Sequence, residues 1–293
     1  MRQPRYQTIG FHLSPDVARL GVPGAFLAVG GLRNRAGDPA FDALLADTVR
    51  QLTATVQPAA LAADPVLLGY RRLHEAIGRS NQRFVAAPEN LLRLTLKRGA
   101  PPRINLLVDI YNLVSLKTRL ALGAHDLSRV EGDIALRLTR GTERFHPLGL
   151  PEATTVGPGE YGYIDGADDV LCRLEVRQSE KTKVTLETTE AFFIIQGNPA
   201  TPPALLRAAT DELIRLIATF CGGEARLLLL PSESASVRKG QPSGSGDDGA
   251  SPSTQRNDPV EGGAPSPPYA VATPSLSHPN ANTFQGRHPC PQP

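Results

Sequence analysis

Cysteine, tryptophan and long apolar runs are scarce in this sequence, and each scarcity excludes a class of protein. The chain has 293 residues, with three cysteines, one methionine and no tryptophan. Three cysteines are too few for a disulfide framework. No apolar run reaches the roughly 20 residues that span a bilayer, and the N-terminus lacks the apolar stretch of a secretion signal. We expect a soluble, cytoplasmic protein with no membrane partner, with Cys172 buried in a strand and Cys221 at a helix end.

Motifs for metals and activated nucleophiles are missing as well. The six histidines are scattered, and no HExxH, CxxC or paired Cys/His spacing occurs. The sequence has no GxSxG turn and none of the signatures of RRM, KH or zinc-knuckle modules. We therefore expect no metal, no other cofactor and no DNA partner.

Proline and glycine are abundant but unevenly placed. Residues 231–293 hold 12 of the 27 prolines and 7 of the 27 glycines, with few large apolar side chains. Such a segment buries too little apolar surface to offset the entropy of ordering it. We predict one folded domain over residues 1–230 and a disordered tail over residues 231–293.

Hydrophobic periodicity predicts helices in the first half of the folded part and strands in the second half. Ser14, Asp38 and Asp64 each precede a proline, which is the signature of a helix start. Further helices are expected from Pro88 to about Gly99 and, opened by Pro202 and Pro203, from Ala204 to about Phe220. Strands are expected at residues 9–13, 26–32, 134–139, 161–164, 170–176, 191–196 and 225–230. This order predicts an α+β domain, a mixed β-sheet flanked by helices.

The small net charge, +2, conceals a basic segment. Between residues 71 and 103, eight arginines and lysines face only two glutamates. Two interpretations stay open: a solvated helical face, or a surface that binds the phosphates of a nucleic acid. The candidate RNA-binding residues are Arg71, Arg72, Arg93, Lys97, Arg98 and Arg103.

Residues 104–120 combine apolar and short polar side chains on one predicted helix. At 100° per residue, Asn105, Asp109 and Asn112 lie close together, opposite a broad apolar face. Asn and Asp are poor helix formers, so their presence indicates hydrogen bonds to fixed partners. These partners are either backbone groups of a neighbouring loop or a ligand.

The same segment resembles a known family. The motifs that carry the resemblance are residues 104–112 and 115–116, 122–127, 131–134, 147–149, 171–173, 177–184, Thr188 and 194–197. They occur in order, over roughly residues 5–225, and are similar to the B3/B4 domain family, named for the editing domain of the phenylalanyl-tRNA synthetase β subunit. The chain is closer to the free-standing bacterial members than to the synthetase.

The resemblance implies an α+β domain that hydrolyses mischarged aminoacyl-tRNA in trans, an aminoacyl-tRNA deacylase with tRNA as its partner. One free-standing branch of the family removes canavanine from arginine tRNA. The alternative is a non-catalytic module that binds an amino acid or a tRNA end and acts with a partner.

Three departures from the synthetase pattern concern the substrate. Asp109 and Asn112 match the synthetase motif, whereas Tyr111 replaces a threonine. Gly123 stands where the synthetase has a histidine, and bulky polar residues replace its glycine-rich turn near residues 176–178. The resemblance therefore implies a target other than tyrosine.

Candidate roles follow from the chemistry of ester hydrolysis, which needs a positioned water and donors for the oxyanion. The predicted catalytic residues are Asn112, Asp109 and His125; for His125 the alternative is a loop histidine that caps the turn at residues 126–128. The predicted substrate-binding residues are Asn105, Ser115, Gly123, Asp126, Glu131, Arg177, Gln178, Ser179, Lys181 and Thr182, with Arg177 or Lys181 expected to meet a tRNA phosphate.

Overall fold

The computed structural model describes residues 3–229, so the tail predicted over residues 231–293 lies outside the described part of the chain. The helices are α1 (Arg5–Thr8), α2 (Pro15–Arg19), α3 (Pro39–Thr55), α4 (Pro65–Ala76), α5 (Ala87–Arg98), α6 (Leu106–Thr118) and α7 (Pro203–Phe220), with 3-10 turns η1 (Pro58–Ala63) and η2 (Leu127–Arg129). The strands are β1 (Phe11–Leu13), β2 (Gly24–Gly30), β3 (Ala121–Asp126), β4 (Ile134–Leu138), β5 (Arg144–Phe145), β6 (Thr154–Thr155), β7 (Tyr161–Ile164), β8 (Val170–Arg173), β9 (Arg177–Gln178), β10 (Glu190–Gln196) and β11 (Glu224–Leu229).

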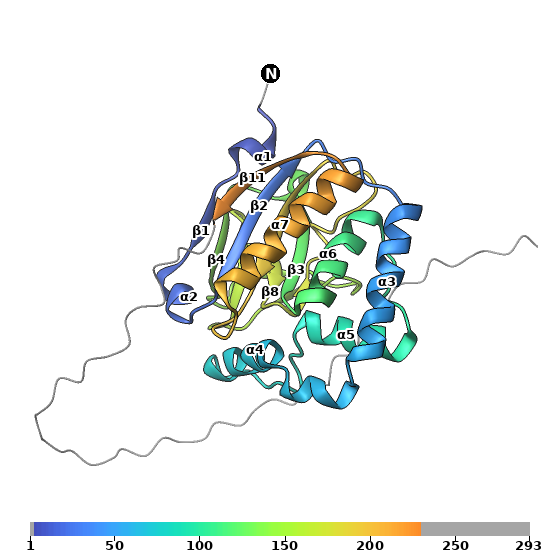
Figure 1. The fold of residues 1–293 in the computed structure, drawn as a ribbon. Helices are drawn as coiled ribbons and strands as arrows, with labels where there is room; N and C mark the ends of the chain where they lie inside the picture. The colour runs from blue at the N-terminus through green and yellow to red at the C-terminus, as the bar shows by residue number, and fades with distance from the viewer. Residues whose placement is uncertain (1–2, 230–293) are drawn as a thin grey trace, which may run out of the picture.

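Two β-sheets and a layer of helices are stacked (Figure 1). The first sheet has the strand order β11-β2-β10-β3 and is antiparallel. The second has the order β1-β4-β7-β8-β9, in which β1 and β4 are parallel and the other neighbours antiparallel. Helices α6 and α7 cover the outer face of the first sheet. The predicted α+β class is confirmed: most strands lie in two packed sheets, and β5 pairs with β6 in a third, two-stranded sheet.

The core lies on both faces of the first sheet, and β2 shows why. Successive strand residues point to opposite faces. Leu27 and Val29 pack in the cluster formed with α6 and α7, whereas Phe26 and Ala28 pack in the cluster shared with the second sheet. The ring of Phe26 stacks on that of Phe11 in β1, with centroids 4.1 Å apart. Because β2 is a central strand buried on both faces, its sequence is a continuous apolar run.

The predicted helix starts are confirmed by side-chain caps. The Asp38 carboxylate accepts hydrogen bonds from the Ala40 and Phe41 amides at 2.9 and 3.2 Å. Asp64 does the same for α4, and Ser14 caps α2. Gly99 ends α5 with φ of 73°, a left-handed conformation that favours glycine. The two buried cysteines are also confirmed, Cys172 in β8 and Cys221 at the end of α7.

Strand β3 was not predicted, and the region after β8 was predicted wrongly. Residues 121–126 pair with β10 along its whole length, so His125 lies inside a strand and not in a loop. The strand expected over residues 170–176 ends at Arg173, because the chain turns at Leu174 with φ of 53°. The chain then returns as β9. Both corrections bring predicted site residues into the sheets.

Candidate functional site

Helix α6 does not present a polar face to solvent. Asn105 and Asp109 are buried like the apolar residues around them. The Asn105 oxygen caps the helix by accepting from the Val108 amide at 3.1 Å, and its amide donates to the Val184 carbonyl at 3.3 Å. The loop-backbone alternative considered for these polar side chains therefore describes the observed contacts of Asn105.

Asp109 holds the segment that leads into α6. Its carboxylate accepts from the Arg103 Nε at 2.6 Å and from the Ile104 amide at 3.1 Å. Burial raises the pKa of Asp109, although Arg103 and the Ile104 amide act in the opposite direction. Arg103 also pairs with Asp42 at 2.6 Å. The guanidinium predicted to bind RNA is thus held by two carboxylates of its own chain.

The other two predicted residues of α6 differ in their surroundings. The Ser115 hydroxyl donates to the Leu120 carbonyl at 2.8 Å, so it fixes the end of the helix. Asn112 is half-buried, and its side chain makes no hydrogen bond within residues 3–229. Of the predicted residues on this helix, Asn112 therefore has the amide with unused hydrogen-bonding capacity.

Strand β3 and residues 177–188, which we call the 177–188 segment, form the clearest convergence of predicted site residues. The Asp126 amide donates to the Thr182 carbonyl at 2.9 Å, and Nδ1 of His125 lies 2.9 Å from the Thr182 hydroxyl. The Asp126 carboxylate accepts from the hydroxyls of Ser128 and Thr188, both at 2.6 Å. The segment is thus fastened along the outer edge of the first sheet.

His125 is a neutral, enclosed imidazole in this arrangement. Burial lowers the pKa of His125 to about 3. Its Nε2 is buried and has no hydrogen-bond partner among the described residues. Because so weak a base takes a proton from water inefficiently, the predicted general-base role does not suit this environment. The ring can still donate or accept a hydrogen bond at Nε2.

Gly123 and Gln178 lie against each other across the gap between the two sheets. A Cβ atom placed on Gly123 would be 2.3 Å from Nε2 of Gln178. Gly123 faces the second sheet, because it pairs with Ile194, which packs between the sheets. Two of the departures from the synthetase pattern, Gly123 and the polar residues near 176–178, therefore meet in space. The Gln178 side chain occupies the room that a side chain at position 123 would need.

Lys181 lines the same region, but its ammonium group is already surrounded by acids. Nζ lies 2.6 Å from Asp169, 3.1 Å from Asp165 and 3.1 Å from Glu131. Burial opposes the charged form, but these carboxylates outweigh it and raise the pKa of Lys181. Arg144 pairs with Asp169 at 2.8 Å and belongs to the same cluster. Lys181, which is expected to meet a tRNA phosphate, and the predicted Glu131 are thus both held in an internal ion-pair cluster.

A cavity of about 500 Å³ opens beside this cluster. It is lined by Asp126, Ser128, Arg129, Glu180, Lys181, Lys183, Thr185 and Glu187. Ser179 lies next to it, with its hydroxyl accepting from the Lys181 amide at 3.2 Å. Sequence reasoning missed Ser128, Arg129 and Thr185 as lining residues. Their signal was position alone, because they stand beside motif residues on the same two loops.

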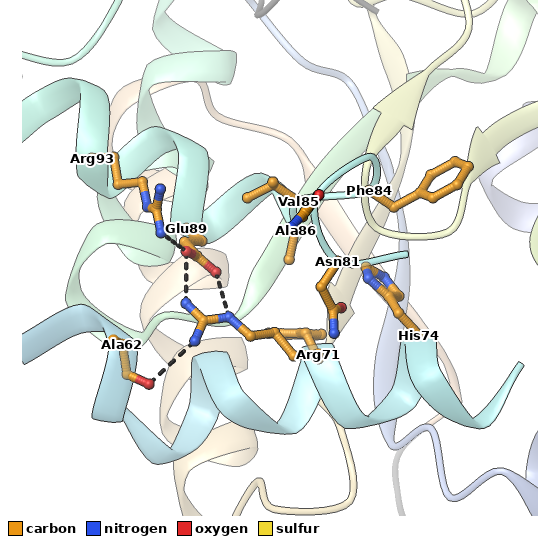
Figure 2. Close-up of a pocket in the computed structure, with 11 residues that line it drawn as sticks. Ala62, Arg71, His74, Asn81, Phe84, Val85, Ala86, Glu89 and Arg93 are labelled. Carbon is orange, nitrogen blue, oxygen red and sulfur yellow. Dashed lines mark hydrogen bonds and ion pairs between the residues drawn. The ribbon is translucent and has the colours of Figure 1, made fainter. Parts of the chain in front are cut away.

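A second cavity, of about 430 Å³, lies between α4, α5 and the loop that joins them. Figure 2 shows Arg71 and Arg93 converging on the buried Glu89, with Nη2–Oε1 distances of 2.8 and 2.5 Å. At the opposite wall, Nε2 of His74 lies 2.5 Å from the Glu175 carboxylate. Burial disfavours the imidazolium of His74, but the hydrogen bond and charge of Glu175 outweigh it and raise its pKa.

The predicted RNA-binding residues divide into three groups. Arg71 and Arg93 meet at this second cavity. Arg72, Lys97 and Arg98 are exposed on α4 and α5 and make no ion pair within the described chain. Arg103 lies away from them, at the start of α6. The structure thus gathers five of the six cations on two neighbouring helices.

Two kinds of feature are absent from residues 3–229. Their His, Cys, Asp and Glu side chains form no group of three that could hold a metal ion. None of their helices combines the length and the hydropathy of a membrane span.

A sequence model of a protein family, described as the B3/4 domain, matches residues 69–222, which is more than half of the chain. The chain belongs to the B3/4 domain family. The resemblance found in the sequence is confirmed by this match.

Two proteins of known name are similar to this chain. The B3/4 chain is 27% identical over 231 residues to the phenylalanine–tRNA ligase β subunit of Shewanella oneidensis, a match that covers 70% of this chain and 28% of that subunit. Among solved structures, it is similar to an N-terminal fragment of the phenylalanyl-tRNA synthetase β subunit from Pyrococcus horikoshii. That match has 16% identity and a TM-score of 0.42, over 77% of this chain and 52% of the fragment. The chain thus spans about a quarter of the ligase subunit it matches.

Both cavities lie largely within the matched B3/4 residues. Every lining residue of the 500 Å³ cavity falls inside the span 69–222, and so does the lining of the 430 Å³ cavity apart from Ala62. Gly123 and Gln178 fall inside it as well. The features that the B3/4 motifs predicted as a site are therefore located in the part of the chain that defines the family.

Proposed function

We propose that this B3/4 protein binds the aminoacylated end of a tRNA and hydrolyses the ester that joins the amino acid to the terminal ribose. The observation that carries the proposal is the convergence of β3 with the 177–188 segment. Gly123, His125 and Asp126 on the strand meet Gln178 and Thr182 on the segment. These are family-motif positions that are far apart in the sequence and side by side in the fold.

Hydrolysis of this ester needs few catalytic groups from the protein. An aminoacyl ester is already activated, so positioning a water and stabilising the oxyanion are sufficient. In this proposal, the Asp126 carboxylate holds the water, because the hydroxyls of Ser128 and Thr188 fix its orientation at the edge of the 500 Å³ cavity. The amides of Gln178 and Asn112 donate to substrate oxygens, since neither makes a hydrogen bond within residues 3–229.

The tRNA acceptor arm would lie on α4 and α5. Arg72, Lys97 and Arg98 are exposed there without ion-pair partners in the described chain, and two guanidiniums share the single charge of Glu89. Phosphate contacts of this kind provide affinity without sequence specificity, and the affinity falls steeply with salt.

One observation favours the alternative of a non-catalytic module. The two groups predicted to activate water are poorly suited to it: burial lowers the pKa of His125 to about 3, which makes it a weak base, and the Asp109 carboxylate accepts from Arg103 and the Ile104 amide. In that case the site formed by β3 and the 177–188 segment would hold an amino acid or a tRNA end for a partner.

A panel of mischarged tRNAs separates the two proposals. Purified protein is incubated with tRNAs carrying different amino acids, canavanyl and tyrosyl esters included, and release of the amino acid is followed over time. A deacylase releases at least one amino acid far faster than buffer does, and faster than it cleaves the corresponding free amino-acid ester. Saturable tRNA binding with no ester release would establish the module instead.

A further inference from the structure

The polar side chain of Gln178 lies where the edge strands of the two sheets come together. Strand β3 is the last strand of the first sheet, and β9 is the last strand of the second. Gln178 of β9 extends its amide over Gly123 of β3, in a position that any Cβ on residue 123 would block. The glycine thus leaves room for the amide.

The backbone of Gln178 is fixed, although its side chain is not used. Its carbonyl accepts from the Leu148 amide at 2.8 Å, and the residue pairs with Cys172 in the β8–β9 ladder. The side-chain amide makes no hydrogen bond to any residue in the range 3–229. A half-buried amide with both its donor and its acceptor available can form hydrogen bonds to a ligand.

A comparable contact elsewhere in the fold shows what a purely structural amide looks like. Asn198 crowds Gly69 in the same way, with its Oδ1 at 1.9 Å from a Cβ placed on that glycine. The Asn198 amide, however, is fully engaged: it donates to the Val66 carbonyl at 2.8 Å and accepts from the Ala200 amide at 3.0 Å. Gln178 also lies close against a glycine, but its side-chain amide makes no hydrogen bond to another described residue.

A second polar atom without a partner lies on the same side of β3. His125 is two residues from Gly123, so both face the space between the sheets. Its Nε2 is fully buried and has no hydrogen-bond partner among the described residues. Buried polar atoms are normally paired, and one left unpaired marks a place where a water or a ligand group belongs.

We infer that Gln178, in the space kept by Gly123, selects the amino acid of the substrate. The amide reads an amino-acid side chain that itself forms hydrogen bonds, and it fills the volume that an aromatic ring would need. This inference rests on the proposed function. A site built around a buried hydrogen bond rejects analogues that lack the matching group far more strongly than an apolar pocket rejects an extra methylene.

The test compares Gln178→Ala, Gly123→Ala and the double variant with the parent. Each protein is assayed on tRNAs carrying polar amino acids, canavanine and arginine among them, and on tRNAs carrying phenylalanine and tyrosine. Gln178→Ala is expected to lower kcat/KM for the preferred polar ester roughly tenfold to a hundredfold. The ratio of polar to aromatic turnover should fall at least tenfold, since the amide is lost and the space opens.

Gly123→Ala should cause a similar loss, because its methyl group displaces the amide. The double variant should lose little more than either single variant, since both changes act through one group. Gln51→Ala, a change of an exposed glutamine on α3, is the matched control and should behave like the parent. Thermal melts verify folding; if Gly123→Ala does not fold, Gln178→Ala, at a half-buried position, carries the test.

Binding of amide-linked aminoacyl-adenosine analogues distinguishes failure of this inference from failure of the proposed function. Parent-like selectivity of Gln178→Ala, in hydrolysis or in binding, overturns the inference and leaves the hydrolase intact. Binding of polar analogues that depends on Gln178, without ester release, supports the inference and overturns the hydrolase. A parent that neither hydrolyses esters nor binds the analogues overturns both.

Discussion

His125 gives the stability of this protein a pH dependence whose sign and size can be worked out. The imidazole is fully buried, and burial lowers its pKa from 6.5 to about 3. Between these two values the unfolded chain binds a proton at this residue and the folded chain does not. Stability therefore falls as the pH falls, with a limiting slope of about 1.4 kcal/mol per pH unit.

Between pH 7 and pH 5 this one group should remove about 2 kcal/mol of stability. In a domain of this size, that loss lowers the melting temperature by roughly 4 to 8 °C. Asp109 has a raised pKa and acts in the opposite direction, and comparison with a His125 variant removes its effect. Glu143 and Glu160 have lowered pKa values, so the stability they contribute is lost only as the pH falls through those values. His74 has a raised pKa, and its contribution is lost at higher pH, as the pH rises through that value.

The assay is urea unfolding, followed by circular dichroism, of the parent and of His125→Asn at pH 7, 6 and 5. Asparagine keeps a polar atom near the Thr182 hydroxyl but does not titrate. At pH 7 the variant should be less stable by about 2 kcal/mol, because it leaves a small cavity. At pH 5 the gap should nearly close, with unchanged m-values. A gap of equal size at pH 7 and pH 5 would refute the reasoning.

Three further predictions concern the basic surface and helix α6. Arg93→Ala and Arg72→Ala should each weaken tRNA binding a few-fold and reduce the slope of log K against log salt by roughly 0.7 to 0.9; unchanged slopes would exclude phosphate contacts there. Asp109→Ala should cost about 2 kcal/mol in urea unfolding, because Arg103 and the Ile104 amide lose their acceptor. Asn112→Ala should leave stability within about 0.5 kcal/mol of the parent and reduce ester release at least tenfold; a parent-like rate would remove Asn112 from the site.

Local signals predicted the helices well because their ends are determined by neighbouring residues. Asp38 and Asp64 cap the helices that follow them, and Gly99 ends α5, as short-range chemistry requires. Strand β3 carries no such signal. Residues 121–126 include a glycine and a histidine and show no clean alternation, since the strand is held by pairing with β10, about 70 residues away.

The sequence named candidate site residues, but it did not predict how they are arranged in space. A helical wheel groups Asn105 with Asp109, but the wheel treats the helix as isolated, and here both are buried and bound by the chain's own groups. The contact between Gly123 and Gln178 joins two sheets across 55 positions of sequence, and no periodicity reports on such a pair. The family motifs named Gly123 and Gln178 as candidates, but motifs do not say which of their residues touch.

The hydrogen bonds that hold the 177–188 segment against β3 limit which substitutions the protein tolerates. An uncovered edge strand is a template for intermolecular pairing and aggregation. Here the Asp126 amide of the edge strand is occupied by the Thr182 carbonyl. Asp126, which lines the 500 Å³ cavity, is thus also a residue through which the 177–188 segment shields the sheet from other chains. Substitutions near this cavity that change side chains and leave the backbone contact in place keep that shield intact.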